Sequence, residues 1–159
     1  MNALVIYDTQ FGNTEQIAQA IAGGLGEFGQ ARAVHVNRSQ EAELREADLL
    51  VLGSPTVAWN PTPAMQAYLK GIAPGSLSRL RTACFDTRMR LPRLLSRSAA
   101  GVIAKRLKSL GVELLLPAEG FFVIGREGPL RIGELERAAD WGRTLRDKYE
   151  ASQPRPAAG

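Results

Sequence analysis

Apolar stretches of strand length alternate along this chain with amphipathic segments of helix length, and this alternation limits the fold more than any other feature. Predicted strands cover residues 3–7, 31–36, 48–53 and 82–86, and a last strand lies within residues 113–124. Predicted helices cover residues 14–28, 41–47, a segment opened by Pro61 and Pro63, 99–110 and 134–149. Five alternations of strand and helix indicate a parallel sheet with helices on both faces.

The third and the last predicted strands each have a distinctive pattern. Residues 48–53, DLLVLG, are nearly continuous in apolar residues, as expected of a central strand that is buried on both faces. The last strand has two interpretations. Residues 113–116 and 120–124 are either two halves of one strand or a strand plus a short β excursion. The pattern alone does not choose between them.

The composition is that of one globular domain. The chain has 159 residues, of which 45% are hydrophobic and 23% charged, enough for a substantial core. We expect residues 1–150 to form this domain and residues 151–159, which lack apolar periodicity, to be disordered. No run approaches the roughly 18 apolar residues of a membrane span, and the N-terminus lacks the pattern of a signal peptide. We therefore expect a cytoplasmic protein.

The chain contains one cysteine and one histidine, which excludes an internal disulfide and a metal centre built from these residues. Cys84 lies in the apolar run TACF, so we expect a buried structural thiol. His35 stands between Val34 and Val36 in a predicted strand, so we expect its side chain to be exposed. Neither residue is a candidate metal ligand.

The loop DTQFGNT, residues 8–14, follows the first strand and leads into the first helix. Thr9, Asn13 and Thr14 are turn-forming and capping residues, and Gly12 permits a backbone conformation that other residues resist. A turn of this kind directs hydroxyls and free backbone N–H groups at one point and favours an anion, typically a phosphate. The alternative is an ordinary strand-to-helix turn capped by Thr14.

Two further polar loops follow other strands: SPTVAWNPT, residues 54–62, and DTRMRLP, residues 86–92. In a doubly wound sheet the carboxyl ends of the strands share one edge, and ligands bind there. The three loops are therefore predicted to converge. A phosphate loop beside hydroxyls, amides and the aromatic Trp59 suits a flat, phosphorylated heterocycle.

The stretch VIYDTQFGNTEQIAQAI, residues 5–21, resembles the N-terminal motif of the flavodoxins and flavodoxin-like FMN proteins. The positions that carry the resemblance are Val5, Ile6, Tyr7, Thr9, Gly12, Thr14, Ala18 and Ile21. The resemblance extends in element order over residues 1–150. It implies a doubly wound five-stranded parallel sheet of order 2-1-3-4-5, an FMN cofactor, and electron transfer with a redox partner protein.

The resemblance also implies a set of cofactor-binding residues. The phosphate cradle would be formed by Thr9, Gln10, Phe11, Gly12, Asn13 and Thr14, without a basic side chain. The segment that flanks the flavin would be formed by Ser54, Pro55, Thr56, Val57, Ala58, Trp59 and Asn60. Thr56 would lie near the ribityl chain and Trp59 against the ring. Asp86, Thr87 and Arg88 would approach the other side of the ring and its pyrimidine edge.

Each of these roles has a structural alternative. Trp59 could pack under the next helix, and Asp86 could cap the turn that follows it. The arginines at positions 88, 90, 93 and 97 could form a solvated face. No residue is predicted to act as a nucleophile or general acid, because the chemistry of such a protein belongs to the flavin.

The chain departs from the resemblance in charge and in one loop. Many flavodoxins are acidic, whereas this chain has a formal charge of +4 and a pI of about 9.6. Its charge favours a partner with an acidic docking surface, and nucleic acid is unlikely because the basic residues are scattered. Val57, Ala58 and Trp59 are expected to resist positive φ, which would hinder a redox-linked peptide flip. Arg88 would stabilise the anion of fully reduced FMN, so that little one-electron-reduced flavin accumulates.

An FMN-binding electron carrier is the function that the sequence predicts. The alternative is an FMN-dependent reductase of quinones or similar compounds that uses NAD(P)H, although the chain shows no separate dinucleotide-binding fingerprint. A flavin-free interaction module is a third interpretation. A phosphate-accepting receiver domain is excluded, because the third strand ends in Gly53-Ser54-Pro55 without an acceptor aspartate.

Overall fold

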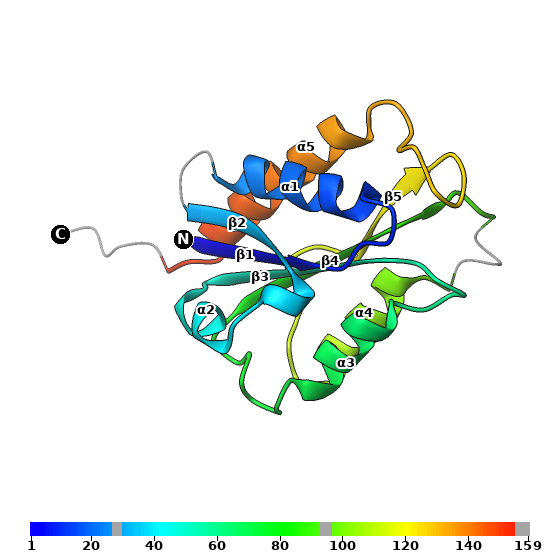
Figure 1. The fold of residues 1–159 in the computed structure, drawn as a ribbon. Helices are drawn as coiled ribbons and strands as arrows, with labels where there is room; N and C mark the ends of the chain where they lie inside the picture. Colours follow the sequence, from blue (N-terminus) through cyan, green and yellow to red (C-terminus); the bar gives the residue numbers. More distant parts are fainter. Residues whose placement is uncertain (27–29, 93–96, 155–159) are drawn as a thin grey trace.

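The computed structural model describes residues 1–26, 30–92 and 97–154 (Figure 1). Strands and helices alternate along the chain as predicted. The strands are β1 (Asn2–Tyr7), β2 (Gln30–His35), β3 (Leu49–Pro55), β4 (Arg81–Met89) and β5 (Glu119–Val123). The helices are α1 (Asn13–Gly26), α2 (Glu41–Glu46), α3 (Pro63–Gly71), α4 (Ala99–Ser109) and α5 (Glu134–Ala151), with a 3-10 turn at Val36–Arg38.

The five strands form one sheet of order β2-β1-β3-β4-β5, and every neighbouring pair is parallel. This is the predicted doubly wound order. Strand β1 lies between β2 and β3, with Tyr7 paired to His35 on one side and to Gly53 on the other. Because the strands are parallel, the loops that follow them leave the sheet at one edge, on the right in Figure 1.

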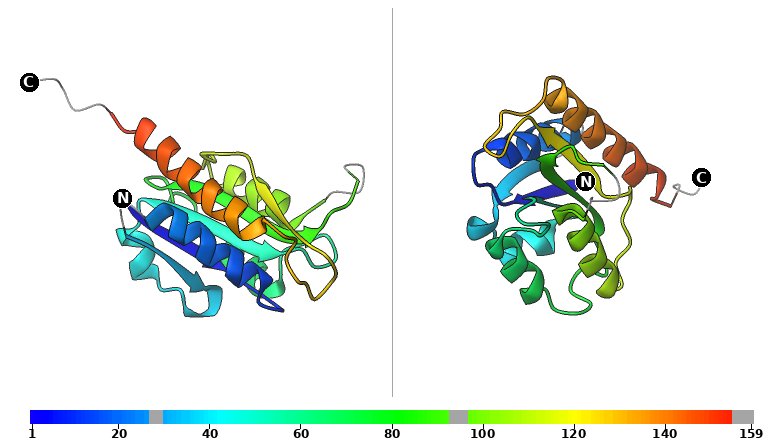
Figure 2. Two further views of the ribbon diagram at one scale, coloured as in Figure 1. Left: turned by 90° about the horizontal axis from the view of Figure 1, so that it is seen from above. Right: turned by 90° about the vertical axis from the view of Figure 1, so that its right-hand side faces the viewer.

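Helices cover both faces of the sheet. Helices α1 and α5 lie side by side over one face, and α3 and α4 cover the other, with α2 beside them (Figures 1 and 2). Alternate residues of β1 serve the two faces: Val5 belongs to the core under α1 and α5, and Leu4 and Ile6 belong to the core over α3 and α4. This double burial explains the continuous apolar strands of the sequence.

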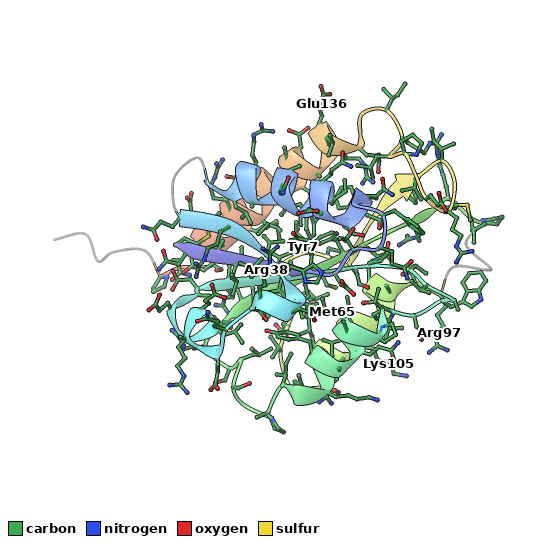
Figure 3. The ribbon with its side chains drawn as sticks, in the orientation of Figure 1. Tyr7, Arg38, Met65, Arg97, Lys105 and Glu136 are labelled. Carbon is green, nitrogen blue, oxygen red and sulfur yellow. The ribbon has the colours of Figure 1, made fainter. Side chains whose placement is uncertain are left out.

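The side chains in Figure 3 show the division between core and surface. Met65 of α3 is fully buried against the sheet, whereas Lys105 of α4 and Glu136 of α5 are exposed. No helix in the described residues is long and apolar enough to cross a membrane.

The structure resolves the two interpretations of the last strand. Residues 113–116 form no strand of the sheet; Leu114 makes a single bridge to Thr82, and the Leu115 N–H donates to the Thr82 carbonyl over 2.8 Å. The excursion is therefore the correct alternative, followed by β5. Strand β4 continues beyond its predicted end at Asp86, because it pairs with β5 as far as Met89. The predicted helix end at Phe28 lies outside the described residues.

The single cysteine is buried as predicted, whereas the single histidine is not exposed, contrary to the prediction. Cys84 is fully buried as predicted, and burial together with the nearby Asp86 raises the pKa of its thiol to about 12. The prediction of an exposed His35 is wrong. Its side chain is partly buried, and its Nε2 lies 3.0 Å from Oδ1 of Asp8. Helix α5 extends to Ala151, and residues 155–159 of the tail lie outside the described part.

Candidate functional site

The loops after β1, β3 and β4 meet at the carboxyl edge of the sheet and enclose two cavities. The larger has a volume of about 960 Å³ and the smaller about 360 Å³. Both are lined by Thr56, Ala58, Arg88 and Met89, so they adjoin each other. The predicted convergence of three polar loops on one rim is therefore present in the structure.

The smaller cavity lies against the loop of residues 8–14. Five backbone N–H groups in this loop and in the first turn of α1 have no acceptor in the described part of the chain. They belong to Gln10, Phe11, Asn13, Thr14 and Glu15. The Gly12 N–H is bound by Thr9 Oγ1 over 2.9 Å, and Gly12 has a φ of +87° with open space where a Cβ would point. The free donors at a helix N-terminus make a site for an anion.

Thr14 closes one wall of this cavity. Its Oγ1 lies 2.8 Å from Oγ1 of Thr87, so the two hydroxyls share one hydrogen bond across 73 residues of sequence. Helix α1 begins at Asn13, which places Thr14 inside the helix. Thr14 is therefore not the cap of the helix, and its hydroxyl joins the loop to the end of β4.

Asp8 is a residue beneath the candidate site that the sequence analysis did not identify as a link between its loops. One carboxylate oxygen accepts the Thr9 N–H over 2.8 Å and faces His35, and the other accepts the hydroxyl of Thr62. Thr62 also caps α3 by accepting the Met65 N–H. Asp8 thus joins the first loop to the loop of residues 54–62. Its position directly after the buried part of β1 was the signal that could have revealed it.

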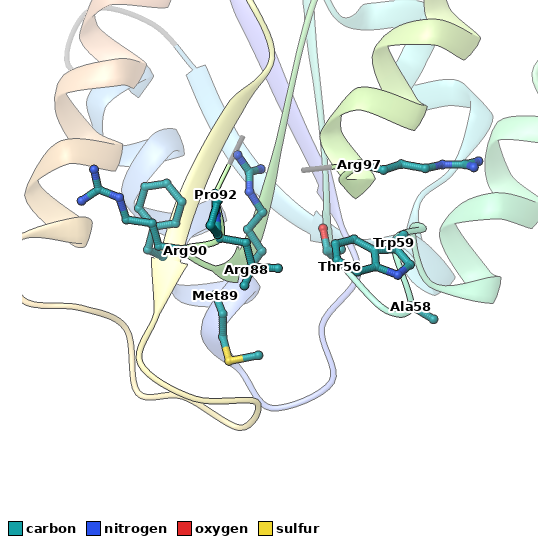
Figure 4. A pocket seen from close by; sticks show the side chains of 10 residues that line it. Thr56, Ala58, Trp59, Arg88, Met89, Arg90, Pro92 and Arg97 are labelled. Atoms are coloured by element: carbon teal, nitrogen blue, oxygen red, sulfur yellow. The ribbon is translucent and has the colours of Figure 1, made fainter. Parts of the chain in front are cut away.

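The larger cavity is open and partly aromatic (Figure 4). Trp59, with 45% of its surface exposed, lies on one side with Thr56 and Ala58. Met89 and Arg90 lie on the other side, from the end of β4. Lining residues that the sequence analysis did not assign to the site are Met89, Arg90, Leu91, Pro92, Arg97 and Phe122. Arg93 lies outside the described residues.

The loop beneath Trp59 is a tight turn in an unusual conformation. The Val57 N–H donates to the Asn60 carbonyl over 2.8 Å, and the Asn60 N–H donates back over 3.0 Å. The two central residues, Ala58 and Trp59, have φ values of +45° and +70°, the pattern of a type I′ turn. The expectation that these residues resist positive φ is wrong, because the two hydrogen bonds fix the turn. The conformation remains strained for residues with a Cβ.

Replacing Ala58 by Gly is expected to raise the free energy of unfolding by about 0.5–1 kcal/mol, since glycine adopts positive φ without strain and only part of that gain is offset in the unfolded chain. Thermal or urea unfolding measures the change. The matched control is Ala67→Gly at an exposed position of α3, which should lower stability by about 1 kcal/mol. A loss of stability in both variants would contradict the strain.

Asp86 and Arg88 form a pair on one face of β4. Asp86 is fully buried, and its carboxylate binds the Arg88 guanidinium, the Thr56 hydroxyl over 3.2 Å and the Ala100 N–H over 2.9 Å. Burial raises the pKa of Asp86, and Arg88 opposes that rise. A Cβ on Gly120 would lie 2.5 Å from the Arg88 guanidinium, so this glycine makes room for the pair.

The structure therefore brings most of the predicted site residues to the cavities and leaves four out, of which Gly12 shapes the first loop without lining a cavity. Ser54 is buried and accepts the Thr62 N–H, Asn60 closes the turn, and Asp86 is buried beneath Thr56 and Arg88. The predicted residues that line a cavity are Thr9, Gln10, Phe11, Asn13, Thr14, Pro55, Thr56, Val57, Ala58, Trp59, Thr87 and Arg88.

A doubly wound parallel sheet with free N–H groups and an adjoining aromatic cavity at its carboxyl edge is typical of nucleotide-binding α/β proteins. Comparison with known proteins narrows this class. The model of the family described as Flavodoxin matches residues 5–123, about three quarters of the chain. The chain belongs to the flavodoxin family, whose members are FMN-binding electron-transfer proteins.

Individual relatives are similar over shorter segments. The chain is 40% identical over 62 residues to a flavodoxin of Aquifex aeolicus (strain VF5), a match that covers 35% of this chain and 34% of that protein. It is 35% identical over 86 residues to a putative diflavin flavoprotein A 3 of Synechocystis sp., covering 50% of this chain and 14% of that protein. The matches thus span about a third of one of these curated relatives and about a seventh of the other.

Similarity of fold extends over nearly the whole chain. The solved structure of a flavodoxin from the domain Archaea superimposes with a TM-score of 0.80 over 94% of this chain and 99% of the other, at 21% sequence identity.

Proposed function

We propose that this chain is an electron carrier that holds FMN non-covalently across the two adjoining cavities, with the phosphate in the smaller and the isoalloxazine ring in the larger. The observation that carries the proposal is the contact between the two cavities through Thr56 and Ala58. Bound FMN supplies the redox chemistry, because it accepts and releases one or two electrons. The protein supplies binding, orientation and charge.

The residues fit this cofactor. The free N–H groups of the first loop, together with the hydroxyls of Thr9 and Thr14, are donors of the kind that bind a phosphate. Thr56 lies in both cavities, where the ribityl chain would pass. The half-exposed Trp59 offers a large π face for stacking on a flat ring. Asp86 would act indirectly, by holding Thr56 and Arg88.

A steady-state assay separates the carrier from a reductase of quinones. We expect the FMN-loaded protein to show no turnover with NADH or NADPH and a quinone unless a separate flavodoxin reductase is supplied. Direct, saturable oxidation of NAD(P)H by the protein alone would contradict the carrier role and favour the reductase.

As part of the same proposal we place the protein in the cytoplasm, because its single buried thiol suits a reducing compartment.

We further propose that its redox partner presents an acidic docking surface to the mouth of the larger cavity. Trp59, Met89 and Leu91 expose 44–45% of their surface there. Arg90 and Arg97 line the same cavity, are exposed, and make no ion pair with any described residue. An apolar centre bordered by free cations is complementary to an apolar patch bordered by carboxylates, and the positive field would steer such a partner to the cofactor.

Small oxidants of opposite charge test this field. The double variant Arg90→Gln/Arg97→Gln is expected to slow oxidation of the reduced protein by anionic ferricyanide by about threefold to tenfold at low salt, through loss of electrostatic attraction. Oxidation by cationic hexaammineruthenium(III) should be faster for the variant than for the wild type, because the repulsion by the two arginines is lost. Stopped-flow spectroscopy measures both rates.

The matched control removes two positive charges far from the cavity. Lys70→Gln/Lys148→Gln alters the ends of α3 and α5, away from the carboxyl edge of the sheet. This control should leave both rates close to those of the wild type. Equal effects of the two double variants would mean that only net charge matters, and would contradict a local docking field.

A further inference from the structure

We propose that Arg126, from the loop that follows β5, binds the phosphate of the cofactor and gives this chain a cationic phosphate site. The proposal rests on the proposed function, because it assumes that FMN occupies the cavities. The loop of residues 8–14 contains no Lys or Arg. The smaller cavity nevertheless has a cation in its wall, because Arg126 lines it together with Thr9, Asn13 and Thr14.

The loop that carries Arg126 is held by a regular set of hydrogen bonds. The Ile124 N–H donates to the Pro129 carbonyl over 2.9 Å, and the Gly128 N–H donates to the Gly125 carbonyl over 3.0 Å. The Arg131 N–H donates to the Phe122 carbonyl over 2.9 Å and closes the base of the loop. Arg126 is therefore at the second position of a tight turn, and its backbone is fixed relative to β5.

The same turn is attached to the phosphate loop. The side-chain amide of Asn13 donates to the Glu127 carbonyl over 3.0 Å. Gly128 has a φ of +105°, and a Cβ there would lie 2.7 Å from Oδ1 of Asn13, so only glycine permits this approach. The two residues that follow the arginine thus lie against Asn13, which itself lines the cavity. The position of Arg126 beside the free N–H groups is a consequence of these contacts.

The charge of Arg126 is not neutralised by an acidic side chain in the described structure. Arg88 is paired with Asp86, and Arg137 with Glu119 and Glu134, whereas Arg126 makes no hydrogen bond or ion pair with a described residue. Its side chain is exposed and free to turn toward the cavity. A guanidinium binds phosphate oxygens through paired, charge-assisted hydrogen bonds. Phosphate is the chemical group that meets both the free N–H groups and this cation.

Binding of FMN and of riboflavin, measured side by side by flavin fluorescence, tests the proposal. Arg126→Gln is expected to weaken FMN binding by about fivefold to twentyfold at low salt, as one charge-assisted contact is lost. Riboflavin, which has no phosphate, should bind as it does to the wild type. The difference between wild type and variant should shrink at high salt because the charge is screened.

Two further variants complete the test. Arg126→Lys retains a point charge without the planar pair of donors and should give an intermediate FMN affinity. Arg131→Gln removes the same charge from an exposed residue at the base of the loop that does not line the cavity, and should behave as the wild type.

The outcomes separate this proposal from the proposed function. Wild-type FMN affinity in Arg126→Gln, or an equal loss of FMN and riboflavin binding, would overturn the role of Arg126 and leave the FMN site standing. A wild-type protein that binds neither flavin would overturn the proposed function itself, and the role of Arg126 with it.

Discussion

Replacing Arg88 by Ala is expected to lower the free energy of unfolding by about 2–4 kcal/mol at neutral pH, because it leaves a buried carboxylate without its cation. Asp86 is fully buried, and the Arg88 side chain is 26% exposed, so the loss should fall somewhat below that of a completely buried pair. The Thr56 hydroxyl and the Ala100 N–H remain as partners of the carboxylate. Denaturant unfolding measures the change.

The pH dependence of this loss identifies its cause. Burial already raises the pKa of Asp86 in the folded protein, and removal of Arg88, which opposes the rise, should raise that pKa further. Between the ordinary pKa of an aspartate and the raised folded value, the folded state binds more protons than the unfolded state. Stability therefore falls as pH rises through this window and recovers as pH is lowered. The difference between Arg88→Ala and the wild type should shrink toward acidic pH.

Arg90→Ala is the matched control for this variant. Arg90 is two residues further along, exposed, and lies 5.9 Å from the Phe122 ring without an acidic partner among the described residues. Its removal should change stability by less than about 0.5 kcal/mol at any pH. An Arg88→Ala variant as stable as Arg90→Ala, or a loss that grows on acidification, would contradict the buried pair.

The pairing also changes what is expected of Arg88 in redox tuning. As a free cation at the pyrimidine edge, Arg88 would stabilise the anion of fully reduced FMN. The Asp86 carboxylate offsets that charge in the structure. Arg90 and Arg97, which make no ion pair within the described residues, are the cations in the larger cavity whose field is not offset. The low accumulation of one-electron-reduced flavin stays a prediction, and these two arginines are the better candidates for it.

Thr14→Val is expected to weaken FMN binding by about tenfold to a hundredfold, since a lost hydrogen bond to a charged group is worth roughly 1.5–3 kcal/mol. Valine keeps the shape of the side chain and removes the hydroxyl that lies between the phosphate loop and Thr87. Loss of a helix cap does not contribute to this effect, because Thr14 lies within α1. Fluorescence titration with FMN measures it.

Riboflavin binding and a second threonine provide the controls. Riboflavin should bind the Thr14→Val variant nearly as well as the wild type. Thr144→Val in α5 makes the same change at an exposed helical position, where the hydroxyl donates to the Asp140 carbonyl. This variant should leave FMN affinity unchanged. If FMN and riboflavin lose affinity equally in Thr14→Val, the phosphate lies elsewhere.

The parts of this structure that could be predicted are those set by local pattern and by topology. Apolar strands alternating with amphipathic helices define the parallel sheet, and a parallel sheet brings the loops after β1, β3 and β4 to one edge. The motif of residues 5–21 then predicts which loop binds the phosphate, and this assignment stays a prediction. The Asp86–Arg88 pair was missed because the predicted strand ends at Asp86. Residues two apart on a strand share a face, and β4 continues to Met89.

The parts that could not be predicted depend on contacts between distant segments. Arg126 and Phe122 reach the cavities because β5 lies beside β4, and nothing in their own neighbourhood indicates a ligand. His35 is partly buried because its side chain contacts Asp8 across the β1–β2 pair. The positive φ values of Ala58 and Trp59 contradict local preference, since two hydrogen bonds across the turn override it.

A titration of the purified, flavin-free protein with FMN tests the central claim most directly. The account predicts saturation at one FMN per chain, quenching of flavin fluorescence by the neighbouring Trp59, and weaker binding of riboflavin because it lacks the phosphate. Visible absorption of the complex should change with the same stoichiometry. Absence of saturable binding, or riboflavin binding as tight as that of FMN, would contradict the assignment of the two cavities to this cofactor.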